Sequence, residues 1–287
     1  MKKIVLAALI VVAGAVSASA ADLPVKTYTK APLPPPCIWC GFYVGVNGGW
    51  GGSAQDNNFS VQGTDPLEDV SVTRAVNYRT TSGGFGGGQI GYNWVFPGGL
   101  NGSGYGWLLG VEADIQGASI RGSNALAFFA DSENLHTAVA SAQLNWFGTL
   151  RGRLGLTAGP VLLYGTGGFA FGGVKNNLNV TEADGSDCTS GVNAVTCASS
   201  SLVSNSSTRA GYVVGAGFEW LFAPSWSVKG EYQYINLGSV NQATSASVQD
   251  NTEPPEGTFG THHVNERFNT VRLGVNYHFG GPVVAGH

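Results

Sequence analysis

The feature that most constrains this chain is an alternation of apolar and polar residues with a period of two, clearest in the last strand-like segment, 267–279. From Val271 to Phe279 every second residue is apolar. The residues between them are Arg272, Gly274, Asn276 and His278. A pleated strand points successive side chains to opposite faces, so this segment has one apolar face and one polar face.

The same alternation recurs along the chain, in segments long enough to cross a bilayer when tilted. The strand-like segments are 41–50, 83–96, 106–120, 142–156, 161–174, 210–222, 226–238 and 267–279. The facing of 161–174 is not assigned, because adjacent leucines and glycines blur its pattern. Long polar connections alternate with short ones such as Gly159-Pro160 and Pro224-Ser225. We therefore predict an all-β, eight-stranded antiparallel transmembrane up-and-down β-barrel with long external loops and short periplasmic turns. The alternative is a soluble β-sandwich.

Composition favours the barrel. Charged residues make up 11% of the chain, against roughly 25% in soluble globular proteins, and the chain holds 44 glycines. Residues 1–20 read as a signal peptide, with Lys2 and Lys3 before an apolar run and a small-residue cleavage site. Residues 21–40 are expected to be a proline-rich periplasmic lead-in, of which 21–36 lies outside any core, with 41–279 the barrel and 280–287 a tail.

The alternation also places charged residues on the inward face. Four acids and four bases share it: Glu112, Asp114, Glu219 and Glu231 with Arg151, Arg153, Lys229 and Arg272. Eight strands enclose an interior that side chains can fill, and charges buried there are tolerable only when they are paired. We expect a rigid ion-pair network and a plugged or very narrow lumen.

Other candidate sites are weaker. Cys188 and Cys197 lie close together in one predicted external loop and are candidates for a disulfide. Cys37 and Cys40 are expected to form a local bridge or to remain two free thiols. The histidines lack the spacing of metal ligands, and two glycine-rich matches to the dinucleotide pattern lie inside strands. We expect no cofactor, no metal and no catalytic set.

Several motifs together resemble a known family. They are Trp39-Cys40-Gly41-Phe42-Tyr43-Val44-Gly45, Gly91-Tyr92-Asn93-Trp94, 147–155, Tyr164-Gly165-Thr166-Gly167-Gly168, Glu231-Tyr232-Gln233-Tyr234 and 271–279. This combination resembles the small outer-membrane β-barrel surface proteins of α-proteobacteria, of the porin-family or opacity type. The resemblance implies an eight-stranded barrel without catalytic residues. Such chains commonly end on an aromatic residue read by the insertion machinery, and the candidates here are Tyr277 and Phe279, although 280–287 follow.

The expected function is therefore non-enzymatic: a barrel in the outer membrane of a Gram-negative bacterium that supports envelope integrity and surface interaction. Its expected partners are outer-membrane lipid, the barrel-insertion machinery, and host or environmental ligands at the external loops. Removal of Lys2 and Lys3 with the signal peptide leaves 12 basic and 18 acidic residues, or 12 − 18 = −6, so no nucleic-acid partner is expected. The alternatives are a porin for small solutes and capture of haem by loop histidines.

Overall fold

The computed structural model describes residues 37–65, 70–78, 82–97, 105–129, 134–184, 198–248 and 256–279. The predicted signal peptide, the tail at 280–287, and both Cys188 and Cys197 lie outside these residues, as does the lead-in up to residue 36. Among the described residues there is no helix whose length and apolar character would let it cross a membrane.

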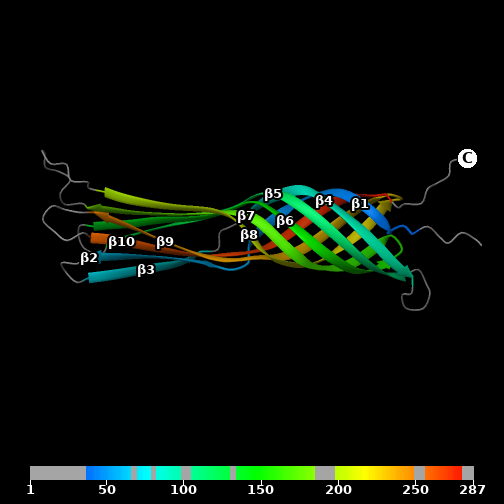
Figure 1. Ribbon diagram of the computed structural model, residues 1–287, viewed down its shortest axis with the longest axis horizontal. Coiled ribbons are helices and arrows are strands. Elements are labelled where there is room, and N and C mark those ends of the chain that lie inside the picture. The colour runs from blue at the N-terminus through cyan, green and yellow to red at the C-terminus, as the bar shows by residue number, and fades with distance from the viewer. Residues whose placement is uncertain are drawn as a thin grey trace, which may run out of the picture. The chain divides into compact units, whose positions relative to one another are not determined.

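The described residues form ten antiparallel strands (Figure 1). They are β1 (Gly41–Ser53), β2 (Asn57–Asp65), β3 (Val70–Tyr78), β4 (Ser82–Pro97), β5 (Tyr105–Phe129), β6 (Asn134–Ala158), β7 (Val161–Asp184), β8 (Ala198–Ala223), β9 (Trp226–Val248) and β10 (Glu256–His278). Eight of them form a ring in the order β1-β4-β5-β6-β7-β8-β9-β10, which β1 and β10 close. The predicted eight-stranded barrel is confirmed, and the ring rules out a simple soluble sandwich.

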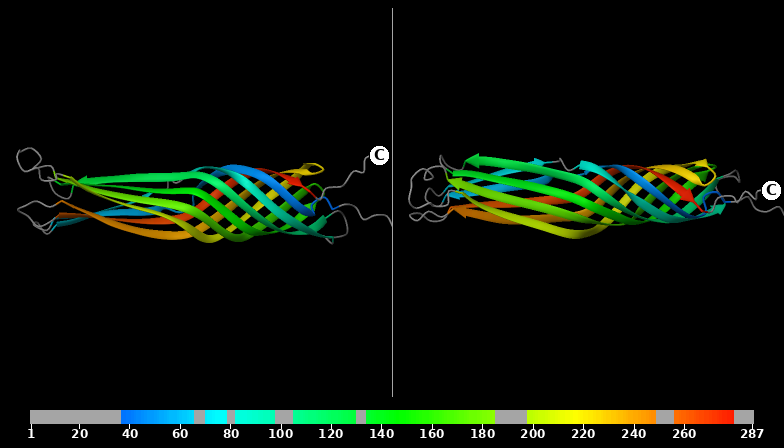
Figure 2. Two further views of the ribbon diagram at one scale, coloured as in Figure 1. Left: turned by 45° about the horizontal axis from the view of Figure 1, so that its top comes forward. Right: turned by 90° about the horizontal axis from the view of Figure 1, so that it is seen from above.

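The strands extend well beyond the barrel and there form two separate sheets. Pairing between β8 and β9 stops at Tyr212 and Asn236. Beyond this point β8 continues to pair with β7, while β9 continues to pair with β10. Since β1 ends at Ser53 and β4 starts at Ser82, the β2–β3 hairpin takes their place beside β10. The sheets β5-β6-β7-β8 and β9-β10-β2-β3 face each other, as the left half of each view in Figure 2 shows. We call this part the two-sheet extension.

The predicted strand boundaries were therefore too short on this side. Much of the polar sequence at 51–82, 121–136, 175–208 and 239–266, which was expected to form loops, continues the strands instead. Irregular pairing marks the transition: register shifts fall between Gly117 and Ile120 in β5 and between Leu144 and Trp146 in β6. A bulge bends a strand and increases its twist, which allows a tilted barrel strand to continue into a straighter sheet.

The outward face of the barrel is an exposed apolar band with aromatic residues near both ends. On β7 the band runs from Val161 through Leu163 and Phe169 to Phe171. The order of exposed and buried residues also resolves the facing of this strand, with Leu162 and Tyr164 inside. Inward residues form successive layers. One apolar cluster, where the barrel meets the two-sheet extension, contains Phe85, Ile120, Leu144, Phe147, Ala170, Val174, Val213, Ile235, Leu237 and Phe268. We call it the waist cluster.

Candidate functional site

All eight charged residues that the alternation places inward lie in one layer of the barrel interior, here called the charged layer: Glu112, Asp114, Arg151, Arg153, Glu219, Lys229, Glu231 and Arg272. Each is buried. Strand register explains part of their proximity, because Glu112 pairs with Arg151 and Glu231 pairs with Arg272 on adjacent strands. Side chains opposite each other on neighbouring strands are close enough to interact. The layer holds four acids and four bases, so its formal charge is balanced.

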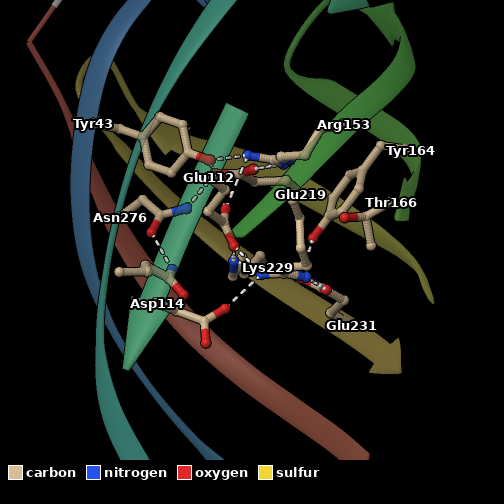
Figure 3. Close-up of polar contacts among 12 residues, drawn as sticks. Tyr43, Glu112, Asp114, Arg153, Tyr164, Thr166, Glu219, Lys229, Glu231 and Asn276 are labelled. Carbon is tan, nitrogen blue, oxygen red and sulfur yellow. Dashed lines mark hydrogen bonds and ion pairs between the residues drawn. The ribbon is translucent and has the colours of Figure 1, made fainter. Parts of the chain in front are cut away.

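Glu112 lies at the centre of the layer (Figure 3). Lys229 Nζ donates to both of its carboxylate oxygens, at 2.8 and 3.0 Å. Arg151 Nη2 donates to its Oε1, and Arg153 Nη1 lies 3.3 Å from its Oε2. The Tyr43 hydroxyl adds a fourth donor at 2.6 Å. A single carboxylate thus accepts bonds from three cations and a phenol, which come from three different strands, β1, β6 and β9.

The other acids connect the remaining residues of the charged layer. Arg151 Nη2 donates to Asp114 at 2.8 Å, and Arg151 Nη1 donates to Glu231. Arg272 Nη1 donates to the same Asp114 oxygen at 3.2 Å, while its Nη2 lies 3.8 Å from Glu231. The layer therefore joins β5, β6, β9 and β10 directly through ion pairs.

Glu219 and Arg153 form the end of the layer nearer the short turns. Arg153 Nη2 donates to Glu219 at 2.7 Å, and its guanidinium carbon lies 4.1 Å from the centre of the Tyr164 ring. Asn276 and Ser227 donate to the second Glu219 oxygen, at 2.6 and 2.5 Å. Each carboxylate oxygen of Glu219 therefore has a donor.

Neutral inward residues complete the layer, and the sequence prediction did not include them. They are Tyr43, Gln89, Thr149, Tyr164, Ser227, Gln233, Asn276 and His278. For example, Tyr164 donates to Glu231 at 2.9 Å and Thr149 donates to Asp114 at 2.7 Å. Most share the parity of the charged residues on their own strand, so the same alternation could have identified them.

The chain before β1 closes the end of the barrel nearer the short turns. Trp39 is 2% exposed and packs in an apolar cluster with Leu108, Leu162, Tyr164 and Leu221. Its indole Nε1 donates to the Gly159 carbonyl at 2.9 Å. The predicted lead-in, 21–40, thus includes a residue, Trp39, that packs inside the barrel. A large aromatic next to a strand end buries more apolar surface inside this barrel than it could outside it.

Of the four cysteines, Cys37 and Cys40 are described by the structure, while Cys188 and Cys197 lie outside the described residues. Cys37 and Cys40 are joined by a disulfide with a Cα–Cα distance of 5.4 Å. Their short loop carries Ile38 and Trp39 into the apolar cluster at the barrel end. This resolves the choice between a local bridge and two free thiols, while the Cys188–Cys197 pairing stays a prediction.

The histidines are dispersed rather than gathered. His136 and His262 are buried between the sheets of the extension, and His278 lies 3.3 Å from Glu219 in the barrel. Burial lowers the pKa of His262 to about 4, and the neighbouring His263 adds to this shift. Burial raises the pKa of Glu266, which accepts a bond from Asn176 at 3.1 Å. In the described segments no group of His, Cys, Asp or Glu side chains is arranged to hold a metal ion.

The aromatic pair proposed for insertion lies at the closing strand. Tyr277 and Phe279 both point outward, with ring centroids 5.1 Å apart. The Phe279 amide donates to the Phe42 carbonyl at 2.9 Å, which extends the seam between β10 and β1 by one residue. Their recognition by insertion machinery stays a prediction.

Comparisons with known proteins agree with this architecture. A family model described as an outer membrane protein beta-barrel domain matches residues 6–279. The 31 kDa outer-membrane immunogenic protein of Brucella melitensis is 36% identical over 284 residues, covering 97% of this chain and 100% of that protein. The 22 kDa outer membrane protein of Rhizobium leguminosarum bv. viciae is 30% identical over 212 residues, covering 73% and 70%.

Among solved structures, the outer membrane protein OprG of Pseudomonas aeruginosa aligns with 13% identity and a TM-score of 0.30, over 83% of this chain and 97% of that one. A score this low carries no weight of its own. The strand ring, the exposed apolar band and the match over nearly the whole chain carry the assignment. This chain belongs to the outer membrane protein beta-barrel domain family, and it is an outer-membrane protein of a Gram-negative bacterium.

Proposed function

We propose that this protein is a closed, non-enzymatic barrel that supports the integrity of the outer membrane and presents its two-sheet extension for surface interaction. The observation that carries the proposal is the filling of the barrel interior. The charged layer lies between the Trp39 cluster at one end and the waist cluster at the other. A water-filled channel needs a continuous polar path, which two apolar layers interrupt.

The charged layer supports a structural role rather than a transport role. Its side chains are occupied with each other, since every acid accepts a bond from at least one cation. A balanced, paired set offers no free charge to attract a solute. Breaking such a buried pair by removing one partner costs about 3–5 kcal/mol, so the layer resists opening.

Single-channel conductance separates the closed barrel from the porin. The refolded protein, checked for the folded form by its heat-modifiable migration on a gel, is inserted into a planar bilayer. We expect no stable conducting steps. Large, reproducible, ion-conducting steps from the folded form would overturn the closed-barrel proposal.

Deletion of the gene in the producing bacterium gives opposite outcomes for the two functions. Loss of an envelope-supporting barrel raises uptake of a hydrophobic fluorescent dye across the outer membrane. Loss of a porin instead lowers uptake of small hydrophilic solutes and leaves dye entry unchanged.

Recognition of host or environmental ligands is proposed for the outer tips, and binding by the insertion machinery is proposed for Tyr277 and Phe279.

A further inference from the structure

We propose that a basic groove on the outer surface of β5, β6 and β7 binds the anionic headgroup of an outer-leaflet lipid. The groove has a volume of about 500 Å³. It is lined by Arg121, Gly122, Ser123, Ser141, Ala142, Gln143 and Asn177. Its small floor residues, Gly122 and Ala142, are paired across β5 and β6.

Two cations and a set of hydroxyl and amide groups face outward along neighbouring strands. Arg121 pairs with Gln143, and Gln143 pairs with Lys175, so the three form one row across β5, β6 and β7. Adjacent strands lie about 4.8 Å apart, which places the two cations roughly 10 Å apart at their Cα atoms. The next row of paired residues, farther from the barrel, adds Ser123, Ser141 and Asn177 to the polar lining.

Among the described residues, neither cation has a charged or hydrogen-bonding partner. Arg121 and Lys175 are exposed, and neither forms an ion pair or side-chain hydrogen bond with any other residue of the described segments. The surrounding stretches 117–125, 139–147, 171–179 and 202–208 contain no acid. By contrast, the outward Arg267 on β10 donates to Gln55 at the other side of the ring. Arg121 in the groove and Lys175 beside it therefore present two positive charges that no described residue compensates.

The position of the groove selects a lipid as its occupant. Immediately on the barrel side of this row lie Trp146 and Phe171, with ring centroids 6.0 Å apart. Trp146 lies across Gly173 on β7, two residues from Lys175, and a side chain at Gly173 would overlap its indole. Aromatic residues mark the level of lipid headgroups in transmembrane barrels. The two cations therefore lie at the level of the anionic headgroups of the outer leaflet.

Two other depressions formed by the described strands lack this chemistry, because their charged lining residues, Arg153 and Asp114, belong to the inward charged layer. The one lined by Leu109, Leu154 and Gly165 lies within the apolar band, and so does the one lined by Ile90, Ala113 and Ile115. Outward residues there can contact acyl chains but offer no cation to a headgroup. Bonds from arginine and lysine to a phosphate are charge-assisted and stronger than neutral hydrogen bonds, so the groove is expected to retain one lipid. This inference does not depend on whether the lumen conducts.

The test compares binding of diphosphorylated lipid A with binding of its phosphate-free derivative to the folded full-length protein in detergent, by native mass spectrometry. We expect the phosphorylated lipid to bind about tenfold or more tightly than the phosphate-free form. The double variant Arg121→Gln with Lys175→Gln should lose that preference. The control variant Arg74→Gln with Arg267→Gln removes the same charge elsewhere and should retain it.

Each outcome decides the proposal. Equal binding of both lipids, an unaltered preference in the groove variant, or equal loss in the control variant would overturn it. Complete competition by millimolar inorganic phosphate would assign the groove to free phosphate and also overturn it. Heat-modifiable migration of each variant confirms that the barrel is folded before binding is measured.

Discussion

At the scale of single residues, the charged layer depends most on Glu112. Its carboxylate receives bonds from Lys229, Arg151, Arg153 and Tyr43. Glutamine at this position would keep the shape but remove the negative charge, and it would place an amide donor among cations. The remaining cations would then outnumber the acids in a buried site.

We expect Glu112→Gln to lower the free energy of unfolding by about 3–5 kcal/mol, because it leaves a buried cation without its partner. Urea unfolding of the barrel in lipid vesicles, followed by tryptophan fluorescence, measures this change. Glu266→Gln is the matched control: Glu266 is also buried, but burial raises its pKa and favours the neutral form. A loss at Glu112 no larger than that at Glu266 would contradict the central place of Glu112.

At the scale of the element, β4 shows that glycines in one strand have different roles. Gly91 pairs with Tyr43 on β1, and a side chain at Gly91 would overlap the Tyr43 ring. Gly88 points outward, and a Cβ there would lie 3.7 Å from the nearest atom, the Gly45 carbonyl oxygen. Gly91 therefore provides the space in which Tyr43 reaches Glu112.

We expect Gly91→Ala to cost about 1–3 kcal/mol through overpacking, because it displaces Tyr43 from Glu112 and Arg153. The temperature of the heat-modifiable gel shift should fall accordingly. Gly88→Ala on the same strand should change stability by no more than about 0.5 kcal/mol. Equal shifts for the two variants would show that β4 glycines act through strand flexibility and not through space for Tyr43.

At the scale of the whole described unit, barrel and extension are stabilised by different interactions. The barrel interior has its charged layer, whereas the extension buries an apolar cluster that includes Phe59, Val61, Leu178 and Val180 between its sheets. His262 lies beside Phe59 in that interior, with ring centroids 6.2 Å apart. Acid should therefore act on the two parts separately.

The pKa of His262 is lowered to about 4 in the folded chain, below the roughly 6.5 of an unfolded histidine. The folded state thus prefers neutral His262, and stability of the extension should fall by about 3 kcal/mol as pH drops from about 6.5 to about 4. Hydrogen exchange of peptides from the extension and the barrel measures this by region. Glu266 has a raised pKa and acts in the opposite sense, so wild type is compared with His262→Phe. An identical pH dependence in both would contradict the assignment.

The alternation of residues by itself determined the barrel, the inward set of charges and the outward apolar band. These follow from local chemistry, because a strand sends Arg151 and Arg153 to one face and Leu150 and Leu154 to the other whatever lies next to it. It also contained the signal for neutral partners such as Asn276, which shares the parity of Arg272. The pattern faded along 161–174, where glycine and paired leucines leave no clear alternation.

Only the tertiary structure decided where the strands end and what fills the interior. The polar sequence of the extension reads as loop because its outward residues are serine, asparagine and threonine, yet its inward residues find partners on a facing sheet. Such long-range burial of Phe59 or Leu178 cannot be read from local sequence. The same holds for Trp39, which precedes every strand and enters the barrel, and for Arg121 and Lys175, which strand register places in one row.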